Sequence, residues 1–202
     1  MTPAISITNL TKSFGSKSAL RGVNLEIPAG ATVGLLGANG AGKTTLIKCA
    51  LGLLRPTSGQ CALLGEDVWS LSAGAKARLG YVPQVISLYP WMRVRELIQY
   101  TASFYATWNA QLTDRLVQEW DIPLDDRVRG LSVGQKQKLA ILTAVAYQPD
   151  LLILDEPAAS VDPQPAGNFC NCWWNSLNRN SARSYFPRIS HQIWNALRIM
   201  WQ

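Results

Sequence analysis

Apolar and polar residues alternate along the first 30 positions of this 202-residue chain. Such alternation is typical of strands that bury one face, and the segments Gly15-Ser16 and Pro28-Ala29-Gly30 have the residue types of turns. We therefore predict antiparallel strands at the start of the chain. Their apolar positions are Ile5, Ile7 and Leu10, followed by Leu20, Val23, Leu25 and Ile27.

Three further short runs predict strands of a parallel sheet. Thr32 to Leu36 is apolar and leads into a glycine-rich loop, as a buried parallel strand does. A second strand is expected near Leu79 to Val82, and a third, Leu151 to Leu154, returns the chain to the same sheet.

Helical spacing of apolar residues appears after the glycine-rich loop and again between Gln84 and Ser132. The first helix begins at Thr44, and Arg55-Pro56-Thr57-Ser58-Gly59 is expected to end it. In the second region two apolar stripes predict a helical insert with an ordinary core rather than an aromatic ligand cage. The stripes are Val94, Leu97, Ile98, Thr101 and Tyr105, and then Leu112, Leu116, Val117 and Trp120. The fold class is therefore α/β, with an N-terminal antiparallel β layer, a parallel sheet and a helical insert.

Composition narrows the class of protein. The chain is 48% hydrophobic and 16% charged, which is typical of a globular protein of one domain. No apolar run reaches the roughly 18 residues that span a bilayer, and the first residues lack the pattern of a secretory signal. We expect a cytosolic protein whose four cysteines are reduced. Cys170 and Cys172 have no second cluster, so a zinc site is not expected.

The net charge of +6 does not predict a nucleic-acid partner, because it is unevenly distributed. All 13 acidic residues precede Pro163, and residues 164–202 contain four arginines and no acid. Without that tail, 15 basic residues face 13 acidic ones. The excess positive charge therefore belongs to the tail, and no nucleic acid is expected.

The glycine-rich loop reads Gly37-Ala38-Asn39-Gly40-Ala41-Gly42-Lys43-Thr44 and lies between a predicted strand and a predicted helix. Glycines let backbone N–H groups turn inward around phosphates, and the following helix adds the positive end of its dipole. Lys43 should reach the β- and γ-phosphates, and the Thr44 hydroxyl should bind Mg²⁺. The alternative is a glycine turn without a ligand. The predicted ATP-binding residues of this loop are Gly37, Asn39, Gly40, Ala41, Gly42, Lys43, Thr44 and Thr45.

Two acids, Asp155 and Glu156, follow the apolar run Leu151–Leu154 directly. Open α/β sheets bind ligands at the carboxyl ends of their strands. Asp155 is the candidate to hold Mg²⁺, and Glu156 the candidate general base that activates water. The alternative is a strand end with two solvated acids.

The segment Leu131-Ser132-Val133-Gly134-Gln135 precedes a helix that contains Leu139, Leu142 and Val145. Ser132 followed three residues later by Gln135 is a capping box, which stabilises a helix N-terminus. The same N-terminus can also donate N–H groups to a phosphate. Both roles are compatible.

These three motifs, in this order, resemble those of the nucleotide-binding subunit of an ATP-binding-cassette (ABC) transporter, a P-loop NTPase. The resemblance extends from about Ile5 to Pro163. It implies that Ser132, Gly134 and Gln135 form a signature that contacts ATP held by a second subunit, although Val133 replaces the first glycine of the family's LSGGQ.

Further residues take their roles from this resemblance. Phe14 matches an aromatic residue that stacks on adenine, the alternative being a core phenylalanine. Gln84 matches a glutamine that contacts Mg²⁺ and the attacking water, which makes Glu156 and Gln84 the catalytic residues and Thr44, Gln84 and Asp155 the metal site. Ala159-Ser160-Val161-Asp162 matches a loop that crosses to the partner's site.

The implied function is ATP hydrolysis, with ATP and Mg²⁺ as ligands, in a homodimer or heterodimer of cassettes that drives a separate transmembrane permease. Residues Val85 to Trp91 are the expected docking surface, and the protein is expected at the inner face of the membrane. One alternative is a soluble cassette ATPase acting on ribosomes or DNA. Another is an inactive, frameshifted remnant.

The family also has a histidine about 30 residues after the Asp155-Glu156 pair. The one histidine of this chain, His191, lacks the apolar strand and the Ser/Thr-x-His approach expected there. The composition changes at the same point: residues 164–202 contain six asparagines, four tryptophans and no lysine or acid. We therefore predict a truncated ATP-binding domain at residues 1–163 and a non-homologous tail at 164–202.

The genetic code indicates that this tail is translated out of frame. When the third base of each codon is read with the first two of the next, Trp173-Trp174-Asn175 must encode Val-Glu. Leu must likewise be encoded by the shifted codons that span three pairs of neighbouring residues: Phe169/Cys170, Asn171/Cys172 and Cys172/Trp173. If stop codons are avoided, the string from Asn168 is F/L-L-Q-L-L-V-E, an amphipathic helix. Residues 183–202 are compatible in the same frame with I-L-L-S-T-H-I-T-S-D-L-E-R-V-A-D-H-V-A, which resembles the family's missing strand, histidine loop and helix. We predict the loss of one base, or the gain of two, near Pro163–Pro165. The chain as written is expected to show weak or absent ATP hydrolysis and poor solubility.

Overall fold

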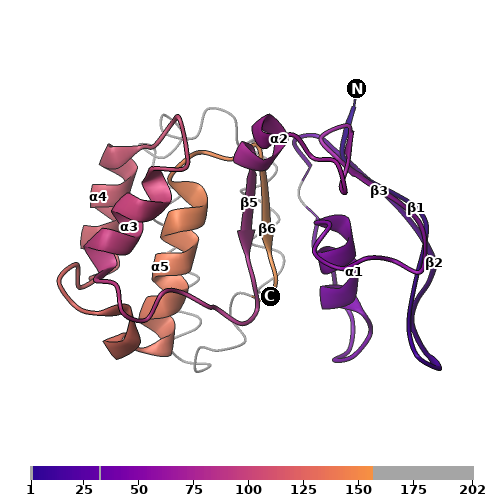
Figure 1. The fold of residues 1–202 in the computed structure, drawn as a ribbon, viewed down its shortest axis with the longest axis horizontal. Coiled ribbons are helices and arrows are strands. Elements are labelled where there is room, and N and C mark those ends of the chain that lie inside the picture. Colours follow the sequence, from indigo (N-terminus) through magenta and orange to yellow (C-terminus); the bar gives the residue numbers. More distant parts are fainter. Residues whose placement is uncertain (1, 32, 157–202) are drawn as a thin grey trace. The chain divides into compact units, whose positions relative to one another are not determined.

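The computed structural model describes residues 2–31 and 33–156, and these divide into two compact units between Lys76 and Ala77. The first unit is built on a four-stranded antiparallel sheet in the order β2-β1-β3-β4 (Figure 1). Its strands are β1 (Pro3–Phe14), β2 (Lys17–Pro28), β3 (Ser58–Leu63) and β4 (Glu66–Asp67). β1 and β2 form the predicted hairpin, with Gly15 in a left-handed conformation at the turn (φ 57°).

The helix α1 (Lys43–Ala50) packs against the strands of this sheet. Leu10 of β1 is fully buried, and α1 buries Leu46, Cys49 and Ala50. The predicted helix is correct at its start but wrong at its end, because it stops at Ala50 rather than near Arg55. Gly52 (φ 68°) ends the helix: its N–H donates to the Cys49 carbonyl oxygen at 3.1 Å, and Leu53 N donates to the Lys48 carbonyl oxygen at 2.8 Å.

The prediction of a buried parallel strand at Thr32 to Leu36 is wrong for its described residues. Residues 33–36 form no strand, and Val33, Leu35 and Leu36 are exposed, Leu36 at 83%. A parallel strand needs hydrogen-bonded neighbours and cover on both faces. Within the described chain the parallel pairing is confined to β5 and β6 of the second unit.

The second unit contains the predicted parallel strands, β5 (Leu79–Val82) and β6 (Leu151–Leu154), paired from Leu79↔Leu151 to Val82↔Leu154. Gly80 lets other chain segments approach β5 closely, because an added Cβ would lie 2.8 Å from the Ala144 carbonyl oxygen. The remaining short elements are α2 (Ala73–Ala77), at the division between the units, and the 3₁₀ turn η1 (Val128–Gly130).

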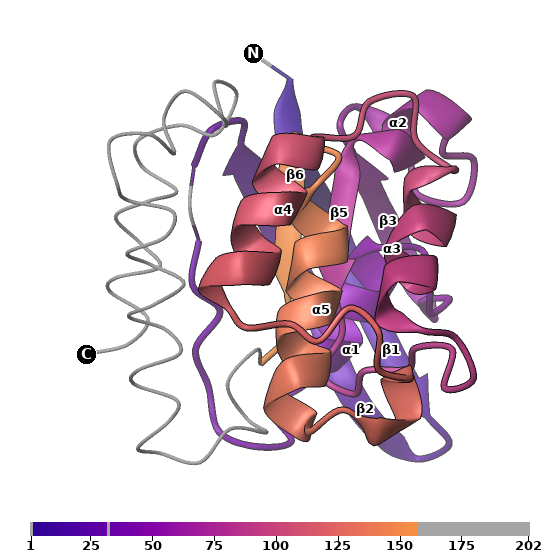
Figure 2. The ribbon, with the colours of Figure 1, turned by 90° about the vertical axis from the view of Figure 1, so that its left-hand side faces the viewer.

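Three helices, α3 (Val94–Ala102), α4 (Ala110–Glu119) and α5 (Val133–Val145), lie on one side of the β5–β6 pair (Figures 1 and 2). The first two form the predicted insert. It is broken between them, where the Asn109 side chain accepts a hydrogen bond from Leu112 N at 2.9 Å and starts α4. Both predicted stripes contribute to the core through Val94, Leu97 and Leu112 and others of their members.

Candidate functional site

The glycine-rich loop leads directly into α1 in the first unit, as predicted. Gly42 is the N-cap residue of α1 with φ 95°, and Gly40 has φ 82°. An added Cβ at Gly42 would lie 2.7 Å from the Ala19 carbonyl oxygen, whereas at Gly40 it would meet nothing within 4 Å. The two glycines are therefore needed for different reasons: Gly40 for its conformation, and Gly42 for conformation and space.

Lys43 is folded over this loop. Its Nζ donates to the carbonyl oxygens of Gly37 at 2.8 Å and Ala38 at 3.2 Å. Thr44 and Thr45 follow in the first turn of α1, and both are half-buried. Lys43 and the positive end of the helix dipole thus lie at the same loop, an arrangement that favours a bound anion.

Phe14 ends β1, and its side chain is 52% exposed. The alternative of a core phenylalanine is therefore wrong. The Nζ of Lys12 lies over the ring, 5.0 Å from its centroid, which is within the range of a cation–π interaction. Sequence reasoning missed Lys12, although its i, i+2 spacing from Phe14 on a strand places both residues on one face.

The predicted catalytic pair, Gln84 and Glu156, is joined by a hydrogen bond in the second unit. Gln84 Nε2 donates to Glu156 Oε2 at 2.7 Å, across 72 positions of sequence. The parallel pairing of β5 and β6 brings these two side chains together. Gln84 lies two residues beyond Val82, and Glu156 lies two residues beyond its paired residue Leu154. Glu156 has a left-handed backbone (φ 51°), which costs a non-glycine residue about 1–2 kcal/mol.

Asp155 comes directly after β6, is 2% exposed, and donates its backbone N–H to the Val82 carbonyl oxygen at 3.0 Å. Burial raises the pKa of the neighbouring Tyr81 hydroxyl, and the nearby Asp155 carboxylate raises it further. The Tyr81 side chain thus lies near the predicted metal-binding acid. Sequence reasoning did not find this electrostatic interaction, because the pattern of β5 gives no signal of which side chain lies near Asp155.

The predicted capping box starts α5. Gln135 N donates to Ser132 Oγ at 3.2 Å, and Ser132 N donates to Gln135 Oε1 at 2.9 Å. Val133, which replaces the family's first glycine, is 57% exposed, and an added Cβ at Gly134 would meet nothing within 4 Å. The start of this helix is therefore open at the two positions between the capping residues.

Several predictions lie outside the described residues: the loop Ala159-Ser160-Val161-Asp162, His191, and the tail from residue 164. Among the described residues, no helix is both long enough and apolar enough to cross a membrane. The same residues contain no cluster of three or more His, Cys, Asp or Glu side chains that could hold a metal. Cys49 and Cys61 are buried free thiols.

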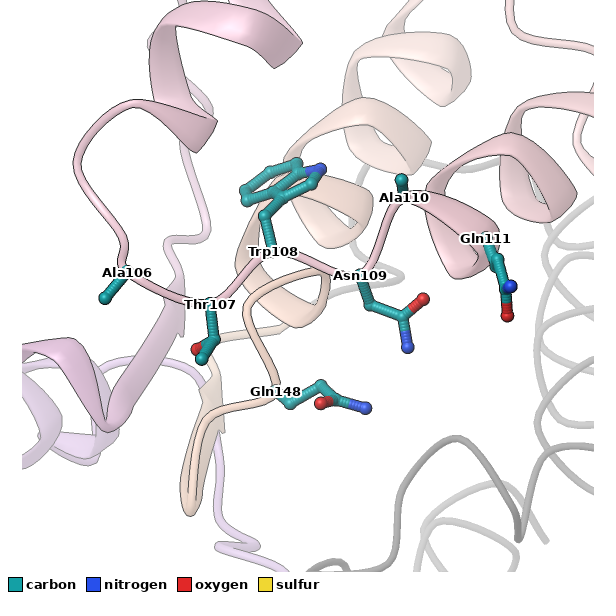
Figure 3. A pocket seen from close by; sticks show the side chains of 7 residues that line it. All are labelled: Ala106, Thr107, Trp108, Asn109, Ala110, Gln111 and Gln148. Carbon is teal, nitrogen blue, oxygen red and sulfur yellow. The ribbon is translucent and has the colours of Figure 1, made fainter.

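A shallow hollow lies where the loop after α3 enters α4 (Figure 3). Asn109, Gln111 and Gln148 contribute amide groups to its lining, and no charged side chain takes part. None of the predicted nucleotide-binding or catalytic residues lines it.

A glycine loop before a helix and a parallel strand pair that ends in two acids define an α/β protein of the P-loop NTPase class. The chain belongs to the ABC transporter family, whose model matches residues 20–159. This confirms the predicted fold class and the resemblance read from the motifs.

Relatives and solved structures agree with this assignment. The chain is 39% identical over 166 residues to Nod factor export ATP-binding protein I of Burkholderia lata, a match that covers 79% of this chain and 54% of the relative. It is 34% identical over 165 residues to the bacitracin transport ATP-binding protein BcrA of Bacillus licheniformis, covering 81% and 54%. A solved ATP-binding subunit of an ABC transporter superposes with a TM-score of 0.72 at 26% identity, covering 86% of this chain and 74% of that one. The chain thus spans about half the length of the curated relatives it matches.

Proposed function

We propose that this chain is the ATP-binding and ATP-hydrolysing subunit of an ABC transporter. The observation that carries the proposal is the Gln84–Glu156 hydrogen bond of 2.7 Å, which joins the two predicted catalytic side chains. The relatives' names support it, since they include ATP-binding proteins of Nod factor export and of bacitracin transport.

Each of the predicted magnesium-binding residues has the chemistry that the ion requires. Thr44 offers a hydroxyl, Asp155 a carboxylate and Gln84 an amide oxygen, which are the oxygen ligands that Mg²⁺ prefers. Because Gln84 uses Nε2 to donate to Glu156, its amide oxygen is left for the metal. When bound, Mg²⁺ neutralises charge on the transferred phosphate.

The protein's own residues then have distinct tasks. Lys43 exchanges its loop carbonyl partners, at 2.8 and 3.2 Å, for phosphate oxygens. Glu156 accepts a proton from the attacking water, and the amide of Gln84 orients this carboxylate. Phe14 offers an exposed ring on which adenine can stack.

The signature region favours a dimer. The capping box occupies the N–H groups of Ser132 and Gln135, so the amides of Val133 and Gly134 are the remaining donors at the start of α5. The γ-phosphate of an ATP held by a second cassette is the proposed acceptor. The cassettes form a homodimer or a heterodimer.

The docking surface for a membrane-spanning partner starts at the predicted segment Val85–Trp91 and extends onto α3. Four exposed aromatic rings form a chain: Tyr89 lies 5.4 Å from Trp91 and 5.6 Å from Tyr100, and Tyr100 lies 4.9 Å from Phe104. Trp91 is 62% and Phe104 65% exposed. Adjacent aromatic side chains exposed in this way are typical of protein interfaces. A permease docked here holds the cassette at the inner membrane face.

Titration with a fluorescent ATP analogue tests nucleotide binding. We expect Lys43→Ala to weaken binding at least tenfold, because the loop loses its one ammonium group. Equal affinity of the two proteins contradicts the phosphate-loop assignment.

The matched catalytic test uses Glu156→Gln, which should bind ATP normally but fail to hydrolyse it. Co-purification with a membrane protein encoded alongside this chain should succeed, whereas a ribosome-sedimenting pool favours the soluble alternative.

We also propose that residues 165–202 are translated out of frame. The family match ends at residue 159, close to the change in composition at residue 164. The truncated chain then binds ATP but hydrolyses it weakly, since it lacks the family's histidine.

Sequencing the gene decides this second proposal. The shifted frame across residues 165–202 should be open and should contain a histidine codon that straddles Arg188 and Ile189. A stop codon in that frame, or the absence of the histidine codon, overturns the proposal. Restoring the frame should raise both the soluble yield and the rate of ATP hydrolysis.

A further inference from the structure

Lys12 and Phe14 form a pair at the end of β1. They are two residues apart on the strand and share one face of it. The Lys12 Nζ lies 5.0 Å from the centroid of the Phe14 ring and donates to the Arg55 carbonyl oxygen at 2.8 Å. The ammonium group is thus held in place by the backbone on one side and lies against the ring on the other.

The backbone around this pair is also held. Thr57 N donates to the Thr11 carbonyl oxygen at 2.8 Å, and Ser13 N donates to Thr57 Oγ1 at 3.0 Å. These bonds attach the end of the hairpin to the segment that enters β3. The ring itself remains 52% exposed. The backbone that carries Phe14 is therefore fixed, while about half of the residue is accessible to a ligand.

We propose that Lys12 is a positioning residue for the base of the bound nucleotide, an inference that rests on the proposed role of Phe14. By lying over the ring, the ammonium group fixes the ring's orientation before the nucleotide arrives. The cation also draws π-electron density toward its own side, which leaves the remaining ring surface a better platform for an electron-rich base. The large purine of ATP gains most from such a platform, and the smaller pyrimidine of CTP gains less.

The test is a double-mutant cycle on the full chain, kept in solution by a fusion partner. Affinities for ATP, CTP and inorganic tripolyphosphate are measured by competition with fluorescent ATP. Lys12→Met should weaken ATP binding about two- to fivefold, the range of an exposed cation–π contact, and should leave tripolyphosphate binding unchanged. The preference for ATP over CTP should fall by the same factor. Lys12→Arg, which keeps the cation, should restore affinity and preference.

Two controls separate the alternatives. Lys17→Met removes the same charge from the residue opposite Phe14 in the hairpin and should change nothing. In a Phe14→Leu background, Lys12→Met should have no further effect. The proposal is overturned if Lys12→Met leaves ATP binding intact, if it weakens tripolyphosphate equally, or if its effect persists without the ring. Failure of the proposed function has a different signature, namely ATP binding that Lys43→Ala does not change.

Discussion

Alanine at Gly42 and alanine at Gly40 should differ in cost, although both residues have left-handed backbones. The conformation alone costs a residue with a Cβ about 1–2 kcal/mol. At Gly40 (φ 82°) nothing lies within 4 Å of the added Cβ, so this is the whole cost. At Gly42 (φ 95°) the Cβ would lie 2.7 Å from the Ala19 carbonyl oxygen and 3.2 Å from Leu20 Cδ2. The backbone oxygen cannot rotate away, and overpacking adds roughly 1–3 kcal/mol.

Hydrogen exchange of the α1 amides, residues 43–50, is the assay, because Gly42 is the N-cap of that helix. We expect Gly40→Ala to lower the free energy of local opening by about 1–2 kcal/mol. Gly42→Ala should lower it by about 2–5 kcal/mol, the sum of the conformational and packing costs. Equal protection of α1 in the two variants refutes the reasoning, because the contact with Ala19 then carries no energy.

Three further predictions concern other parts of the chain. Ser132→Ala removes the cap of α5 and should lower the protection of its first turn by about 0.5–2 kcal/mol; an unchanged exchange rate contradicts the capping role. Gly80→Ala should cost about 1–3 kcal/mol in urea unfolding, because its Cβ would lie 2.8 Å from the Ala144 carbonyl oxygen and 2.9 Å from Leu152 Cδ1; a neutral result means that β5 can move away. Burial, with smaller effects of Cys49 and Asp67, raises the pKa of Cys61 from 9.0 to about 11. The folded state therefore holds a proton that the unfolded chain releases, so stability is full below pH 9 and falls by about 2 kcal/mol between pH 9 and 11. Cys61→Ala should flatten this decline in unfolding measured against pH.

Local sequence rules found the elements whose partners lie close by in the chain. The β1–β2 hairpin follows from alternation and a glycine turn, and the Ser132–Gln135 capping box from a spacing of three residues. The pairing of β5 with β6 could also be predicted, because both are short apolar runs before functional polar residues. In each case the signal lies in the residues that make the contact.

The predictions that went wrong or were missed have different physical causes. The end of α1 has a local signal that the prediction passed over: Gly52 follows the C-cap Leu51 in a left-handed conformation, the usual place of a glycine that ends a helix. Val33–Leu36 has the composition of a buried strand, but strand formation also requires neighbours that its own residues cannot supply. The cation–π contact of Lys12 with Phe14 was missed because the sequence does not say which side chains on a strand face will touch.

The backbone of Glu156 gives the proposed base an unusual energetic balance. Its left-handed conformation costs about 1–2 kcal/mol, and a hydrogen bond to a charged group such as the one from Gln84 returns roughly 1.5–3 kcal/mol. The hydrogen bond from Gln84 thus offsets the cost of the backbone conformation that places the Glu156 carboxylate beside the amide.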